Sequence, residues 1–307
     1  MAFAAKSKLD ESETGESKRK ISFMTNAAGR LTSSTTPPGK EPGTKSADSG
    51  SQTGRSPLFV GSVAKGFAVL NAFKQARDSL SLSEISVATG MGKSAAQRFC
   101  HTLVELGYLE RDDASKRMRP SAKLLELSHT FLATDPINSI AAPFLLQARE
   151  ACGQAVNLAL PMEQDVIYIL RLPSTKSPLL NPLVGGRAPM FCTSSGRAYL
   201  STLPPQEVER ILDASDLRPL TRNTITDRDE ILRRIEQVLA NGYATASQEC
   251  INGELTIGAP IFGSGRVGVG AINICVTIPT WSEERIVKEL APIICQTAHD
   301  ISLALAS

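Results

Sequence analysis

The sequence lacks the features of several protein classes. It has no run of about 18 consecutive apolar residues, the minimum for a membrane-spanning helix, and no apolar signal core after MAFAAK. Its three histidines stand far apart and none of its six cysteines forms a C-x-x-C pair, so we expect neither a metal site nor a disulfide scaffold. We therefore predict a cytoplasmic protein with no cofactor and no membrane partner.

Large apolar residues are nearly absent from residues 1–57, which consist mainly of Ser, Thr, Gly, Pro and Lys. Such a segment cannot bury enough surface to offset its conformational entropy, so we predict a disordered tail. Its lysines could add weak attraction to DNA, although a dispensable tail is the simpler interpretation.

The net charge of +2 conceals an uneven distribution. Residues 60–123 contain ten Lys and Arg against six Asp and Glu, whereas residues 136–307 contain fourteen against seventeen. A basic module joined to an acidic one is common in nucleic-acid binders that carry a second domain. An ordinary solvated surface explains the same numbers, so charge alone leaves both interpretations open.

Residues 58–120 have the pattern of a winged helix-turn-helix. Apolar residues at helical spacing predict a first amphipathic helix over 62–75, namely Val63, Phe67, Leu70 and Phe73. A second helix is predicted to use Ser83 as its N-cap, to turn Ile85 and Ala88 inward and to stop at Gly90. A third helix is predicted from residue 93 to about 106, ended by Gly107.

The third helix has two contrasting faces when it is plotted at 3.6 residues per turn. The apolar face consists of Ala96, Phe99, Cys100, Leu103 and Leu106, and the polar face of Ser94, Gln97, Arg98, His101 and Glu105. Arg and Gln can form paired hydrogen bonds with guanine and adenine, and Lys93 and Ser94 lie at the helix start, which favours phosphate. The polar face is therefore predicted to contact DNA; the alternative is an ordinary solvated helix face.

A polar turn over residues 112–116 separates two short strands, 108–111 and 117–119, which are predicted to form a hairpin wing. Its basic residues would approach the flanking DNA backbone or the minor groove. The contacts predicted for double-stranded DNA are therefore Lys93, Ser94, Gln97, Arg98, His101, Lys116, Arg117 and Arg119.

The remaining chain alternates between helical and strand patterns. A linker helix is predicted over 121–134, closed by Pro136, and another over 137–151. Two antiparallel hairpins are predicted, AVNLALP with DVIYILRLP and a second across residues 263–265. Further helices are predicted near Ser194, in PPQEVERILDAS, in DRDEILRRIEQVLANG and over 282–305, the third of these with Ile231, Ile235, Val238 and Leu239 on one face.

Antiparallel strands with inserted helices define an α+β domain. The predicted organisation is a disordered tail over 1–57, a winged helix-turn-helix over 58–120, a linker helix over 121–135 and a C-terminal domain over 136–307.

Ordered motifs across residues 60–305 resemble the IclR family of regulators. Residues 62–70, 82–85, 90–94 and 103–109 resemble its winged helix in order and spacing, and residues 124–127 resemble its linker helix. Residues 154–159, 185–189, 192–198, 242–244 and 259–261 resemble its effector domain. The segments 191–193, 249–250 and 253–254 look closer to the branch that governs aromatic-acid catabolism.

The resemblance implies a non-enzymatic DNA-binding transcription regulator with a GAF-like effector domain, assembled as a homodimer or tetramer. It implies an effector that is a small carboxylic acid, aromatic or keto, and it leaves contact with RNA polymerase open. The linker helix would transmit binding as a population shift between two domain arrangements.

The effector site would lie at the helix that begins near Ser194, where free N–H groups and hydroxyls suit a carboxylate. The residues that match the family's pocket are Ser194, Ser195, Thr256, Asn273 and Cys275, to which we add Met190, Thr193 and Glu249. Alternatively, the serines only cap the helix and the others satisfy local strand contacts.

Two other functions fit parts of the sequence. Cys192 beside Thr193 could act as an enzymatic nucleophile, but no histidine lies near it in sequence. A thiol-responsive winged-helix regulator could use Cys192 or Cys275 without any metabolite, which would require an exposed thiol of low pKa.

Overall fold

The computed structural model describes residues 56–76, 78–176 and 184–307. The described residues from Val60 to Ser307 group into one compact unit. All but residues 56 and 57 of the predicted disordered tail lie outside the described residues. Among the described helices, none is long and apolar enough to cross a membrane.

The winged helix-turn-helix predicted from the sequence is confirmed. Its elements are α1 (Gly61–Ala72), α2 (Leu82–Thr89), α3 (Lys93–Glu105), β1 (Leu109–Arg111) and β2 (Met118–Pro120). The two strands pair antiparallel, and Leu80 adds a bridge to Met118 that ties the wing to the residues before α2. The module has its own apolar core, formed by Val69, Phe73, Ile85, Ala96, Cys100, Leu103, Leu109 and Met118.

The beginning of α2 differs from the prediction. Ser81, not Ser83, is the N-cap: its hydroxyl accepts a hydrogen bond from Glu84 N, and the Glu84 carboxylate accepts one from Ser81 N. This reciprocal capping box satisfies two backbone donors, which a cap at Ser83 would leave open. Ile85 is buried as expected, but Ala88 is exposed, because only one side of this short helix contacts the core.

The buried face of α1 also differs from the predicted one. Val69 and Phe73 enter the core, whereas Val63 and Phe67 are exposed. The exposed pair lines an apolar groove of about 450 Å³ together with Leu106 and Leu127. Helical spacing shows which residues share a face, but it does not show whether that face packs within the chain.

Two consecutive helices follow the wing. They are α4 (Leu124–Thr134) and α5 (Pro136–Cys152), and the extended backbone of Asp135 separates them as the following proline requires. The Asp135 carboxylate accepts a hydrogen bond from Asn138 N and so caps α5.

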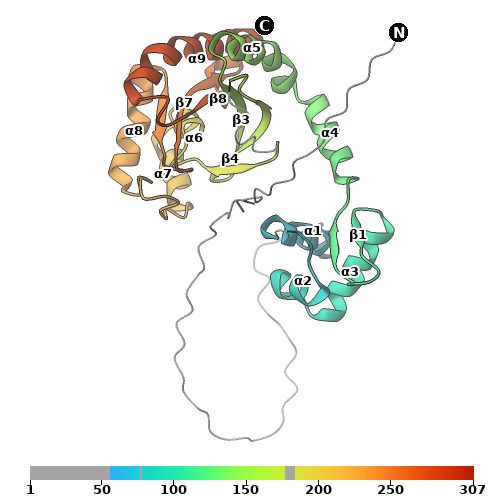
Figure 1. The fold of residues 1–307 in the computed structure, drawn as a ribbon. Helices are drawn as coiled ribbons and strands as arrows, with labels where there is room; N and C mark the ends of the chain where they lie inside the picture. Colours follow the sequence, from blue (N-terminus) through green and yellow to red (C-terminus); the bar gives the residue numbers. More distant parts are fainter. Residues whose placement is uncertain (1–55, 77, 177–183) are drawn as a thin grey trace, which may run out of the picture. The chain divides into compact units, whose positions relative to one another are not determined.

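The C-terminal region contains a six-stranded antiparallel sheet in the order β5-β4-β3-β8-β7-β6 (Figure 1). Its strands are β3 (Ala155–Met162), β4 (Asp165–Leu172), β5 (Arg187–Pro189), β6 (Ala244–Ser247), β7 (Glu254–Phe262) and β8 (Gly268–Thr277). Both predicted hairpins and the α+β class are confirmed, while the short edge strands β5 and β6 were not predicted.

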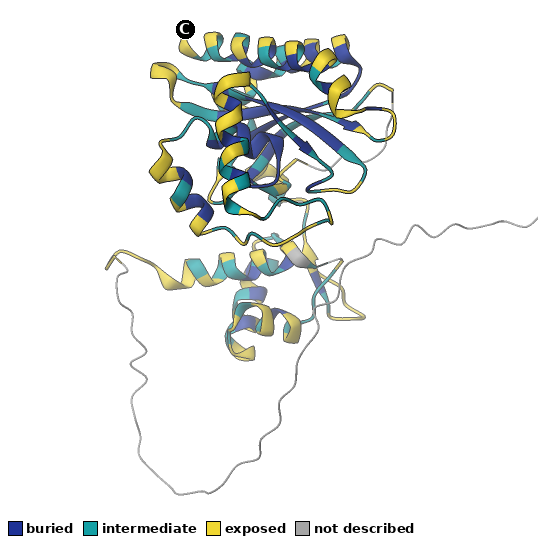
Figure 2. Ribbon diagram, turned by 90° about the vertical axis from the view of Figure 1, so that its left-hand side faces the viewer, coloured by how far each residue is buried: buried dark blue, intermediate teal, exposed yellow. Residues whose placement is uncertain are grey.

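Helices cover both faces of this sheet. On one face lie α5 and α9 (Glu283–Ala306), which share the largest apolar core with the strands. On the other lie α6 (Ser194–Leu200), α7 (Pro205–Asp213) and α8 (Arg228–Asn241). Figure 2 shows that buried residues concentrate along the strands. In α8 the prediction is wrong for Leu239, which is 73% exposed, whereas Ile231, Ile235 and Val238 are buried.

The small helix α6 lies unusually close to its surroundings. A Cβ atom at Gly196 would lie 2.2 Å from Met190 Cα, and one at Gly258 in β7 would lie 3.0 Å from the Ser194 carbonyl carbon. Only glycine permits such backbone contacts at these two positions. They hold the beginning of α6 directly over the middle of the sheet.

Replacing Gly196 by Ala should lower the free energy of unfolding by about 1–3 kcal/mol, because the new methyl group meets backbone atoms that cannot rotate away. Gly66→Ala in α1 is the matched control, since its Cβ would meet nothing within 4 Å. Urea denaturation followed by circular dichroism measures both. Equal stability of G196A and the unmodified protein would contradict the packing described.

Candidate functional site

The polar face of α3 points away from the protein core. Lys93, Ser94, Gln97, Arg98 and His101 are all exposed, and within the described part of the chain their side chains form no hydrogen bond or ion pair. The opposite face carries the buried Ala96, Cys100 and Leu103 and the half-buried Phe99, whereas Leu106 was expected inward and is exposed. The apolar face of α3 thus packs in the core of the module, and the opposite face presents polar side chains without partners among the described residues to solvent.

The wing arginines are engaged within the module. Arg117 donates hydrogen bonds to Ser79 Oγ at 3.0 Å and Ser79 O at 2.7 Å, and it pairs with Glu84 at 3.0 Å. Arg119 pairs with Glu110 across the hairpin at 2.8 Å. Lys116 is exposed at the turn with a positive φ of 57°. Arg117 therefore fixes the wing to the residues before α2, and Lys116 is the basic side chain that the turn leaves outward.

A cavity of about 130 Å³ lies on the face of the large sheet that α6 covers, at the beginning of that helix. Five of the eight predicted ligand residues line it, namely Thr193, Glu249, Thr256, Asn273 and Cys275. The other three, Met190, Ser194 and Ser195, are fully buried and are not part of its lining. The two serines form the first turn of α6, and Thr193, not Ser194, caps that helix through a hydrogen bond from Gly196 N.

Two lining residues that the sequence did not predict come from β4. Asn157 and Ala159 in β3 lie opposite Arg171 and Tyr168, so that a register shift leaves Ile169 as an extra residue. This β-bulge changes the alternation of side chains and places Tyr168 and Arg171 on one face although they are three residues apart. The Arg171 guanidinium lies over the Tyr168 ring at 4.1 Å from its centroid.

The floor of the cavity is polar. Asn157 and Asn273 face each other across β3 and β8, and Asn157 Nδ2 donates to Asn273 Oδ1 at 3.3 Å. Both amides also donate to Cys275 Sγ, at 3.3 and 3.1 Å. Asn157 is not itself part of the cavity lining, but its amide supports Asn273 and Cys275, which are.

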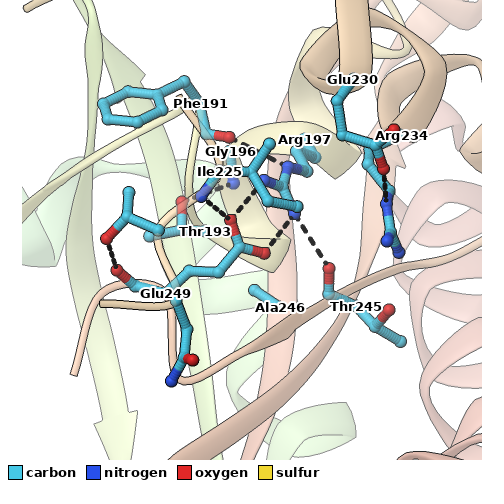
Figure 3. Close-up of polar contacts among 12 residues, drawn as sticks. Phe191, Thr193, Gly196, Arg197, Ile225, Glu230, Arg234, Thr245, Ala246 and Glu249 are labelled. Atoms are coloured by element: carbon cyan, nitrogen blue, oxygen red, sulfur yellow. Dashed lines mark hydrogen bonds and ion pairs between the residues drawn. The ribbon is translucent and has the colours of Figure 1, made fainter. Parts of the chain in front are cut away.

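A buried ion pair supports one wall of the cavity. Arg197 in α6 and Glu249, in the segment between β6 and β7, are 1% and 5% exposed, and two hydrogen bonds of 2.7 and 2.6 Å join them. Arg197 also donates to Phe191 O at 2.9 Å and Thr245 O at 3.3 Å. Figure 3 shows the guanidinium surrounded by these acceptors. The Glu249 carboxylate, predicted as a ligand group, is thus committed to Arg197.

Further hydrogen bonds hold this segment from the α7–α8 connection. Ile225 N donates to Glu249 Oε2 at 3.2 Å (Figure 3). The hydroxyls of Thr221 and Thr224 donate to Gln248 O and Glu249 O, each at 2.6 Å. Since Gln248, Glu249 and the next two residues line the cavity, its shape depends on these contacts.

The ionisable groups of the cavity are perturbed by burial. Burial raises the pKa of the Glu254 carboxyl, although Cys275 and Arg171 act in the opposite direction. Burial and the nearby Glu254 raise the pKa of the Cys275 thiol. A hydrogen bond to Cys250, together with burial, raises the pKa of the Cys192 thiol. Cys192 and Cys275 are therefore protonated thiols, which are poor nucleophiles.

No group of three or more His, Cys, Asp or Glu side chains in the described ranges is arranged to hold a metal ion.

Comparison with known proteins places both regions. Residues 62–113 match the IclR helix-turn-helix domain, and residues 129–303 match the C-terminal domain of bacterial transcriptional regulators of the IclR type. The Pca regulon regulatory protein of Pseudomonas putida is 30% identical over 246 residues, which cover 80% of this chain and 84% of that protein.

Solved structures show the same fold. The IclR of Thermotoga maritima matches with a TM-score of 0.62 at 27% identity, over 80% of this chain and 99% of that chain. An IclR homolog from Microbacterium hydrocarbonoxydans, complexed with 4-hydroxybenzoate, matches with a TM-score of 0.66 at 23% identity, over 80% and 98% of the two chains.

Replacing Glu249 by Gln should lower the free energy of unfolding by about 3–5 kcal/mol, because it leaves the buried Arg197 charge without its counter-charge. The control is Glu207→Gln, which removes an exposed pair with Arg210 (side chains 49% and 67% exposed) and should cost at most about 1 kcal/mol. Urea titration of both variants gives the comparison. Similar losses in both would show that burial of the Arg197–Glu249 pair is unimportant.

Proposed function

The chain belongs to the IclR family of bacterial transcriptional regulators, and from that premise we propose that its winged helix-turn-helix binds a specific DNA operator under the control of a small carboxylic acid. The observation that carries the DNA-binding part is the stripe on α3 whose polar side chains have no partner within the described residues. A solvated face needs no such composition, whereas a recognition helix needs free donors.

Base and phosphate contacts divide along α3. Gln97 and Arg98 lie one turn inside the helix, where side chains can contact base edges in the major groove. Lys93 and Ser94 form its first turn, where backbone N–H groups add to the attraction for phosphate. His101 lies one turn further along the same face and would contact the flanking DNA.

The wing would contact DNA mainly through Lys116. Its side chain is exposed at the turn, while Arg117 is occupied by Ser79 and Glu84. Arg119 is exposed and can exchange its Glu110 partner for a phosphate, because an exposed ion pair is worth at most about 1 kcal/mol.

We assign effector binding to the cavity beside α6. Its polar groups converge from four strands and from the beginning of a helix, and a volume near 130 Å³ fits one small molecule. The 4-hydroxybenzoate complex of the Microbacterium homolog shares the fold and guides the choice of test compounds.

Assembly as a homodimer or tetramer is part of this proposal. Val63, Phe67, Leu106 and Leu127 line the apolar groove on the DNA-binding module, and Leu125 and Phe131 of α4 are exposed nearby in sequence. Exposed apolar groups of this number favour contact with a second copy. Effector binding would then change, through α4, the spacing between the DNA-binding modules of two copies. Contact with RNA polymerase would follow only if the protein activates transcription.

The thiol-responsive alternative has one observation in its favour. Cys192 and Cys250 both line the cavity, and their interaction raises the pKa of the Cys192 thiol and lowers that of the Cys250 thiol. The raised pKa of Cys192 and of Cys275 disfavours both thiols named by the sequence. Alkylation that abolishes regulation in the absence of any acid would support this alternative.

Replacing Arg98 by Ala should weaken binding to the specific operator by about 1–3 kcal/mol, because a base contact is lost. Lys93→Ala should weaken specific and nonspecific DNA alike and lower the salt slope by about 1. Arg210→Ala, an exposed arginine on α7, is the control and should change neither. Fluorescence anisotropy at several salt concentrations measures all three, and R98A binding as tightly as the unmodified protein would remove the base contact.

A further inference from the structure

The charges that line the cavity are unequally neutralised. The arginines and glutamates that line the cavity are Arg171, Arg187, Glu249 and Glu254. Arg187 is paired with Glu163 and Asp165, each at 2.9 Å, and Glu249 is paired with Arg197. Arg171 and Glu254 have no ion pair within 4 Å among the described residues.

No acid of the described residues lies within ion-pair distance of Arg171, although Glu254 lines the same cavity and interacts with it electrostatically. The β-bulge in β4 turns Arg171 toward the cavity, and its guanidinium stacks over the Tyr168 ring. Its Nε–H is buried and has no hydrogen-bond acceptor in the described residues. A buried donor without an acceptor is uncommon in folded proteins and calls for a ligand or water that satisfies it. The planar guanidinium is the group that best matches a carboxylate with two parallel hydrogen bonds.

Glu254 opposes a second negative charge. Its side chain lines the same cavity beside Cys275, and burial raises its pKa. A ligand with two carboxylates would place one of them close to Glu254, because the cavity measures only about 130 Å³. Two negative charges at that distance repel each other, and burial already makes ionisation of Glu254 unfavourable. An engineered cavity of about 150 Å³ in another protein holds one benzene molecule, so there is little room to separate two like charges.

We propose that Arg171 binds the carboxylate of the effector and that Glu254 restricts the effector to acids with a single carboxylate. The inference rests on the proposed function. It adds that the effector has one negative charge and that Arg171 and Glu254 select for this charge. When the effector binds, the stacked guanidinium replaces the water around its carboxylate. Asn273 lines the cavity beside this site, and Asn157 donates a hydrogen bond to Asn273.

The first test compares benzoate with its neutral analogue benzamide by isothermal titration calorimetry on the full-length protein. Arg171→Met should weaken benzoate binding roughly 10- to 100-fold and leave benzamide unchanged, because only the charged hydrogen bonds are lost. Arg171→Lys should lie between the two, since it keeps the charge and loses the stacked, forked geometry. Arg210→Met is the control: this arginine forms an exposed ion pair with Glu207 outside the cavity lining, and its loss should change benzoate affinity less than about threefold.

The second test compares 3-nitropropionate with succinate, which have the same shape and differ by one negative charge. The unmodified protein should bind the singly charged acid more tightly by about tenfold or more, and Glu254→Gln should reduce that preference. Succinate binding as tightly as 3-nitropropionate would overturn the role given to Glu254.

Operator binding without ligand, measured for every variant by anisotropy, shows that each protein is folded. If the acids bind and change operator affinity while R171M behaves as the unmodified protein, the inference fails and the proposed function stands. If no acid of either set binds the unmodified protein, both fail.

Discussion

The buried Arg197–Glu249 pair is the constraint on which the effector domain depends. An ion pair removed from water is stable only when both partners keep ideal geometry and every remaining donor finds an acceptor. Arg197 meets this condition through the carbonyl groups of Phe191 and Thr245 (Figure 3). The pair therefore fixes α6 against the wall segment after β6, and the cavity lies between them.

The two candidate sites differ in whether their polar groups are exposed and in whether they already have partners. On α3 the donors are exposed and unpaired, so that a long polyanion can meet all of them at once. In the cavity most polar groups already have partners, whereas Arg171 has no ion pair and its Nε has no acceptor among the described residues, which suits it to a small anion. In the proposed function, α3 supplies affinity for DNA that salt weakens, and the cavity supplies a switch that responds to a ligand of one defined charge. Linkage requires that the effector and the operator change each other's affinity by the same factor, whether the coupling is positive or negative.

Elements that depend on residues close together in the sequence were predicted correctly. The helix-turn-helix followed from apolar spacing with Gly90 and Gly107 in left-handed conformations at the helix ends, and both hairpins followed from turn residues. Five predicted pocket residues line the cavity. The role of Arg171 was missed because the β-bulge at Ile169 reverses the alternation on which a strand prediction relies. Exposed Val63 and Leu239 were placed inward because periodicity carries no information about a face that packs on nothing in the same chain.

A crystal structure of the full-length protein grown with benzoate tests the central claim most directly, because it locates the anion independently of any substitution. The account predicts the benzoate carboxylate within hydrogen-bond distance of the Arg171 guanidinium, with the ring beside Asn273 and the Arg197–Glu249 pair intact. Benzoate bound elsewhere, or in the cavity with its carboxylate turned away from Arg171, would contradict it.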